Sequence, residues 1–334
     1  MGFLGNLLKK IRGEAPTELI LVPSVPVSGM SGIGDPIVVD ECYIELYVES
    51  LRLERARRFA TKFDGAVYSF VSLSRDGQER SELAAVSKPN KLAELDKKSL
   101  GNVITVSKQM MGAVPWRGGT IGLEVGLFSI KRGNVLTPVL DYVDKVSSTA
   151  GISFVGAVKP FLPLIKDGVD LLAGQQQDTE IEVALDTDMA LTMTCVLAMI
   201  DAPKGSLDPS KVTLDPNDRR LLLSGKPLDK GYFVLSIRKT EQKTDFGEIP
   251  ELKEKYAAIQ AAIRANKQTE AEDALTAFRL ATIVSPDLIT KDAAALVEKA
   301  RKKLEAAFVR GPISRSTRGA SIEALSEIGL YPRN

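Results

Sequence analysis

The sequence contains no histidine at any of its 334 positions. Ser-His-Asp and Cys-His nucleophilic systems use an imidazole as the general base, so this absence excludes them. The common zinc and non-haem iron sites also rely on imidazole ligands. Any chemistry would have to use carboxylates, lysine, tyrosine or an unassisted thiol. The composition therefore favours a binding protein over an enzyme.

Cysteine is nearly as scarce, since the chain has only Cys42 and Cys195. Two cysteines are too few for the disulfide framework of a small secreted protein. Both lie in apolar, strand-like stretches, where an unpaired cysteine usually behaves as a small buried hydrophobic residue. We expect two buried free thiols, and a disulfide between them is the alternative.

Long hydrophobic runs are also missing. No window approaches the ~18 uncharged apolar residues of a transmembrane helix, and the longest candidate, Met189–Ile200, is short and contains several threonines. The first residues carry their positive charges after the apolar ones, unlike a secretory signal peptide. These features predict a cytoplasmic protein, with association to a membrane surface as an open alternative.

Neither sign of charge is in excess, because 44 Lys and Arg residues accompany 43 Asp and Glu residues. A general nucleic-acid-binding protein usually has a clear basic surplus, so nucleic acid is not a favoured partner. The hydrophobic content of 44% is enough for one large domain or two ordinary domains.

The chain from Thr17 to Lys239 reads as many short strands separated by turn signals. Over Tyr43–Ser50, side chains alternate with the period of two that is typical of a half-buried strand. Regular spacing of strands and turns favours a sandwich or barrel. Residues 135–174 change to a helical period, and we interpret them as an αα insertion.

From Ile249 onward the pattern is helical. It predicts helices from Pro250 to about Ala265, over Glu270–Ile283 and over Thr290–Phe308. The predicted fold class is therefore α+β, with a β-rich, sandwich-like domain at residues 15–245 followed by an α-helical domain at residues 246–310. An amphipathic N-terminal helix at residues 1–14 and a basic tail at residues 311–334, with a helix-like stretch at Ser321–Ile328, flank these domains.

The N-terminal segment carries the strongest functional signal. Its apolar residues recur at helical spacing, and its cations follow at the C-terminal end, where they suit the helix dipole. Such a helix can dock onto another protein or onto its own chain, or lie in a membrane interface, and fraying of the segment is the remaining alternative. The residues expected to make the contact are Phe3, Leu4, Leu7, Leu8, Lys9, Lys10, Ile11 and Arg12.

Two further groups of charged residues are candidate sites. Asp186 and Asp188 lie in an acidic stretch that could bind a metal such as calcium, because hard cations bind clustered carboxylates, although Asp is also an ordinary turn residue. A basic cluster could contact phosphate or lipid headgroups, or form ion pairs on a solvated face. This cluster consists of Arg52, Arg55, Arg57 and Arg58.

The sequence as a whole favours a non-enzymatic interaction or assembly protein that docks through its N-terminal helix and its helical domain. A peripheral membrane protein using that helix and the arginine cluster is the first alternative. A carboxylate-based or metal-dependent enzyme is the second. No cofactor is predicted, and the expected partner is another protein or a second copy of the chain.

Overall fold

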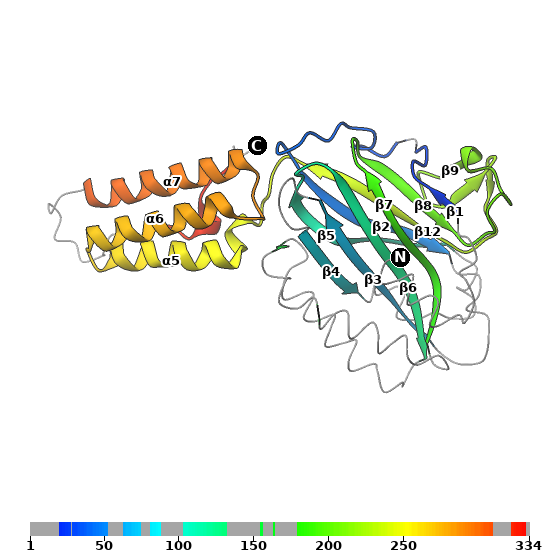
Figure 1. Cartoon of the computed structure of the whole chain (residues 1–334), viewed down its shortest axis with the longest axis horizontal. Coiled ribbons are helices and arrows are strands. Elements are labelled where there is room, and N and C mark those ends of the chain that lie inside the picture. The colour runs from blue at the N-terminus through cyan, green and yellow to red at the C-terminus, as the bar shows by residue number, and fades with distance from the viewer. Residues whose placement is uncertain are drawn as a thin grey trace. The chain divides into compact units, whose positions relative to one another are not determined.

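The structure is a computed structural model that describes residues 20–27, 29–52, 63–74, 81–87, 103–131, 154–155, 163, 179–309 and 322–331. These residues form antiparallel sheets followed by three helices, which confirms the predicted α+β class. The chain divides into two compact units (Figure 1). The β-rich unit comprises Met1–Val38, Ile44–Ala113 and Arg117–Lys239, and the helical unit comprises Val39–Tyr43, Val114–Trp116 and Thr240–Asn334.

A five-stranded sheet has the order β1-β8-β12-β2-β5, and β8 pairs antiparallel with both of its neighbours. Every residue of β8 is buried, so both faces of this strand are covered by other side chains. The strands are β1 (Ile20–Val22), β2 (Tyr43–Arg52), β5 (Val103–Pro115), β8 (Cys195–Ile200) and β12 (Tyr232–Thr240).

A four-stranded antiparallel sheet has the order β4-β3-β6-β7. A shift in register at Leu127/Phe128, between β6 and β7, marks a bulge or irregularity. The strands are β3 (Phe63–Leu73), β4 (Ser81–Ser87), β6 (Thr120–Lys131) and β7 (Thr179–Ala190).

A small third sheet, β9 (Val212–Leu214), β10 (Leu221–Leu223) and β11 (Lys226–Pro227), packs into the core of the β-rich unit. Alternate residues of β8 and β12 face this core, because side chains alternate between the two faces of a strand. The buried cluster includes Val196, Ala198, Ile200, Val212, Leu214, Leu221, Tyr232 and Val234.

The three helices of the helical unit are α5 (Pro250–Arg264), α6 (Gln268–Val284) and α7 (Thr290–Val309), and they lie side by side (Figure 1). Proline suits the first turn of α5 because that turn needs no backbone donor. The rings of Tyr256 and Phe278 pack in the buried interface with centroids 5.5 Å apart. Within the described part of the chain, none of the helices is both long and apolar enough to cross a bilayer.

Several boundaries differ from the sequence predictions. The sequence predicts a strand over Val103–Ser107, whereas β5 extends to Pro115, and Gln109 beyond the predicted end donates to Glu45 of β2 at 2.9 Å. Strand β6 begins at Thr120, since Gly118 and Gly119 both adopt positive φ in the preceding turn. Of the predicted helix-like stretch Ser321–Ile328, the structure describes residues 322–328, where a short 3-10 turn forms at Leu325–Glu327. The predicted N-terminal helix and nearly all of the αα insertion lie outside the described residues.

Cys42 and Cys195 are both free and buried, which confirms the predicted pair of buried thiols. Burial raises the pKa of the Cys195 thiol from 9.0 to about 11, which leaves roughly a hundredfold less thiolate at neutral pH.

We expect the native protein to react with a thiol reagent at neutral pH far more slowly than the unfolded chain, at both cysteines. Mass spectrometry of the labelled peptides measures the two rates separately. Rapid modification of both thiols in denaturant is the control, and modification of native Cys195 at the unfolded rate would contradict its burial.

Candidate functional site

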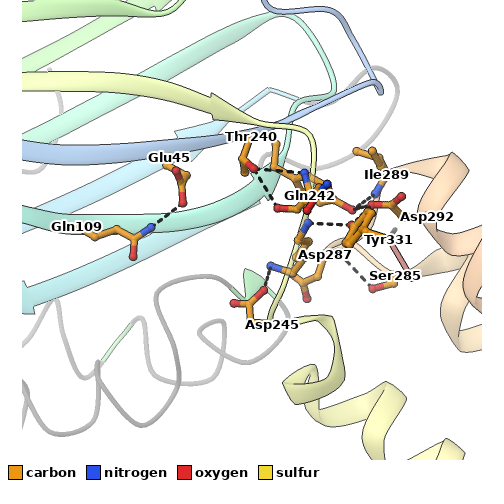
Figure 2. A network of polar contacts seen from close by, with 12 residues as sticks. Glu45, Gln109, Thr240, Gln242, Asp245, Ser285, Asp287, Ile289, Asp292 and Tyr331 are labelled. Carbon is orange, nitrogen blue, oxygen red and sulfur yellow. Dashed lines mark hydrogen bonds and ion pairs between the residues drawn. The ribbon is translucent and has the colours of Figure 1, made fainter. Parts of the chain in front are cut away.

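A buried carboxylate, Asp292 in the first turn of α7, joins distant parts of the helical unit. Its Oδ2 accepts a hydrogen bond from Tyr43 Oη at 2.6 Å and another from Tyr331 Oη. Only 4% of Asp292 is exposed, so these phenols take the place of water around the charge. Figure 2 shows Tyr331 directed at Asp292.

Each phenol that donates to Asp292 also accepts a backbone amide. The N–H of Ile289 donates to Tyr43 Oη at 3.3 Å, and the N–H of Lys243 donates to Tyr331 Oη at 2.8 Å. Burial raises the pKa of both tyrosines well above the ordinary value, and the hydrogen bond to Asp292 raises it further. Both phenols therefore stay protonated and hold the carboxylate in place.

A lysine completes this buried network. Lys243 is fully buried, and its Nζ lies 3.2 Å from Asp245 Oδ1 and 5.9 Å from the centroid of the Tyr43 ring. A buried cation needs such compensation, because removing it from water is costly. The aromatic face and the carboxylate supply it together.

The segment before Tyr43 caps α7. Asp40 Oδ1 accepts the N–H of Thr290, the first residue of that helix, at 3.1 Å. The Asp40 N–H donates to the carbonyl of Trp116, and the Trp116 N–H donates to the carbonyl of Cys42. Asp40 adopts a φ of 59°, a left-handed conformation that Asp tolerates better than most residues. Two short segments, Val39–Tyr43 and Val114–Trp116, are thus fastened to each other and to the start of α7.

A second buried network lies in the β-rich unit. Glu49 on β2 is fully buried; its Oε1 accepts from Ser236 and Arg238 on β12, and its Oε2 accepts from Ser107 on β5 at 3.2 Å. The Arg238 guanidinium also lies 4.4 Å from the centroid of the Tyr47 ring. Charge-assisted hydrogen bonds therefore bind β2 to both neighbouring strands.

Of the predicted arginine cluster, only Arg52 falls within the described residues. It forms an ion pair with Asp229 and donates to the Lys230 carbonyl at 2.8 Å. Its side chain is only 11% exposed. Arg52 therefore has partners within the protein, whereas the structure does not describe Arg55, Arg57 and Arg58.

Asp186 and Asp188 are exposed on β7, where they lie opposite Glu124 and Gly122 of β6. Across the described residues, no group of three or more acidic or cysteine side chains is placed to hold a metal ion. The predicted N-terminal contact residues, from Phe3 to Arg12, lie outside the part of the chain that the structure describes.

An exposed apolar surface on α6 was not predicted. Leu280, Ile283 and Val284 are 61%, 56% and 73% exposed, and Ala277 is exposed one turn earlier. These four residues, which we call the α6 stripe, recur at i, i+3, i+6 and i+7 and therefore share one helix face. Their helical spacing was visible in the sequence, but the sequence does not show which apolar face the packing leaves uncovered.

Comparisons with protein-family models, with curated proteins and with solved structures find no match to this chain.

The hydrogen bonds of Tyr43 predict that Tyr43→Phe destabilises the protein by about 1–3 kcal/mol, because Asp292 and the Ile289 amide both lose a partner in a buried site. The matched control is Tyr256→Phe, since the Tyr256 hydroxyl is buried and has no hydrogen-bond partner among the described residues. Its removal should be nearly neutral. Urea unfolding measures both changes, and equal losses would contradict the role assigned to Asp292.

The raised tyrosine pKa values also predict a loss of stability at high pH. Tyr256 shifts from 10.0 to about 12 through burial, and Tyr43 and Tyr331 also shift upward. The folded state therefore holds these protons more tightly, so their contribution is complete below pH 10 and is lost as pH rises above it. Helical circular dichroism should fall together with the appearance of tyrosinate absorbance. Ionisation of all tyrosines near pH 10 with intact helices would contradict the assignment.

Proposed function

We propose that this chain is a non-enzymatic assembly protein that associates with a second copy through its helical unit. The observation that carries the proposal is the α6 stripe. Scattered surface hydrophobics are ordinary, whereas adjacent ones on a single helix face are typical of a docking surface. Among the described residues of the three helices, large exposed hydrophobic side chains occur only on α6.

The other helices carry charge pairs on their exposed faces. Arg301 on α7 pairs with Glu298 and Glu305, and the hydrogen bond from Arg301 lowers the pKa of Glu298 to about 2. On α5, Lys255 pairs with Glu254. Charged faces of this kind are well solvated, whereas the exposed face of α6 is apolar. Helix α6 is therefore the one best suited to contact another protein.

The α6 stripe suits a second copy because it is self-complementary. Consider two α6 helices that pack antiparallel with the two-fold axis at Leu280. In this pair Ile283 of one copy would face Ala277 of the other, and Val284 would face Thr276. Large side chains would then meet small ones on both sides of the two-fold axis, as an isologous interface requires. Ala277, Leu280 and Val284 also have the a-d-a spacing of a coiled-coil seam.

The proposal includes two finer features. The five-stranded and four-stranded sheets would pack as a sandwich, and this is supported by burial of both faces of β8. The amphipathic segment at residues 1–14 would provide a second docking element, and this is supported by its apolar spacing in the sequence.

Leu280→Lys should convert the dimer to monomer and weaken association by about thirtyfold or more, because it places two buried cations opposite each other at the two-fold axis. Sedimentation velocity over a range of protein concentrations measures this change.

The matched control is Ala258→Lys, which adds the same charge at an exposed position of α5 and should leave association unchanged. A native chain that is monomeric at every concentration, or a Leu280→Lys variant that dimerises like the native chain, would overturn the proposal.

A further inference from the structure

The C-terminal strap, residues 322–331, folds back over the helical unit as a largely extended peptide (red in Figure 1). It runs antiparallel to α7. Glu323 pairs with Lys303 at 2.7 Å, and the Gly329 carbonyl accepts from Lys299, nearer the start of the helix. On the α5 side, Gln260 Nε2 donates to the carbonyls of Ile322 and Glu323 at 3.2 and 2.9 Å. The surface of α5 and α7 therefore contacts both the backbone carbonyls and an acidic side chain of the strap.

Two buried apolar side chains and a close backbone contact with Gly247 hold the middle of the strap. Leu325, the first residue of the 3-10 turn, and Ile328, the residue after the turn, are each only 3% exposed. A Cβ added to Gly247 would lie 2.4 Å from the Cα of Ser326, so the strap can approach only because residue 247 has no side chain. This combination of paired anchors, backbone acceptors and a glycine contact is typical of a peptide-binding site.

The end of the strap enters the buried network. Tyr331 donates to Asp292 and accepts from the Lys243 amide. If the strap undocked, the Lys243 amide and the Asp292 carboxylate would each lose one hydrogen-bond partner. This loss costs free energy, so the site is more stable with a strap bound.

The connection between α7 and the strap is much longer than its span requires. Residues 310–321 supply 12 residues, or up to ~40 Å of chain. Val309 lies six residues past Lys303, the partner of Glu323, which is ~9 Å along the helix. The excess length allows the strap to leave its own helices and reach those of another molecule.

We propose that the strap-binding surface of α5 and α7 is a peptide-binding site that accepts the C-terminal strap of a second copy in place of its own. The exchanged strap would make the same contacts, so exchange loses no native interaction and is governed by protein concentration. This inference goes beyond self-association through α6, because it uses a different surface of the unit.

The test uses the full chain with a protease site replacing residues 312–317, cleaved after folding. A fluorescent synthetic peptide of residues 321–334 should replace the resident strap and saturate at one peptide per chain. The Leu325→Ala, Ile328→Ala peptide should bind at least about thirtyfold more weakly.

A pair of glycine variants tests the site itself. Gly247→Ala in the chain should abolish peptide uptake, whereas Gly329→Ala in the peptide should bind normally, since a Cβ at Gly329 would meet nothing within 4 Å. Equal effects of the two changes would overturn the assignment of this surface, as would a cleaved, folded chain that takes up no peptide.

A final arm tests the second copy as the occupant. In this arm both chains carry Leu280→Lys, so that the α6 stripe cannot hold them together. Uncleaved Gly247→Ala chain, whose strap cannot dock on itself, should then form a 1:1 complex with cleaved chain that has been washed free of its own strap. If the peptide binds but this chain does not, the strap serves only its own molecule and the inference fails. Leu280→Lys should not alter peptide uptake, so failure here is distinguishable from failure of the α6 interface.

Discussion

The helical unit depends on the carboxylate of Asp292. Two tyrosines from opposite ends of the chain donate to it, and each also receives a backbone amide. The four segments that meet there are Val39–Tyr43, the backbone at Lys243, the start of α7 and the C-terminal strap. Removing any member leaves a buried polar group without its partner, and the cost of that loss holds the segments together.

The exposed surfaces of the helical unit differ from this closed interior. Tyr43, Lys243 and Asp292 are buried. Tyr43 donates to Asp292, and Lys243 pairs with Asp245 and donates its amide to Tyr331, so these contacts fix the ends of the helices. The helices so fixed present two surfaces of different character. The α6 stripe is apolar and exposed. The strap-binding surface instead combines hydrogen-bonding side chains such as Gln260 with buried positions for Leu325 and Ile328. Both would require the rigid arrangement that Asp292 maintains.

The helices could be predicted to within a few residues because their signals are local: Pro250 opens α5, and the 3.6-residue period continues through α7. The Asp292 network could not, since Tyr43 lies 249 residues away and nothing near either residue marks the pairing. Glu49 illustrates the same limit. Alternation along β2 places it on the more polar face, and only the neighbouring strands supply the serine and arginine partners that permit its complete burial.

The most direct test of the central role of Asp292 is amide hydrogen exchange at Lys243 and Ile289 in the full chain. Both amides lie outside regular helix hydrogen bonding and donate to tyrosine hydroxyls. The Asp292 network predicts that they exchange as slowly as the interior amides of α7, because they open only when the unit unfolds. Exchange at the rate of exposed loops, with the helices still protected, would contradict it.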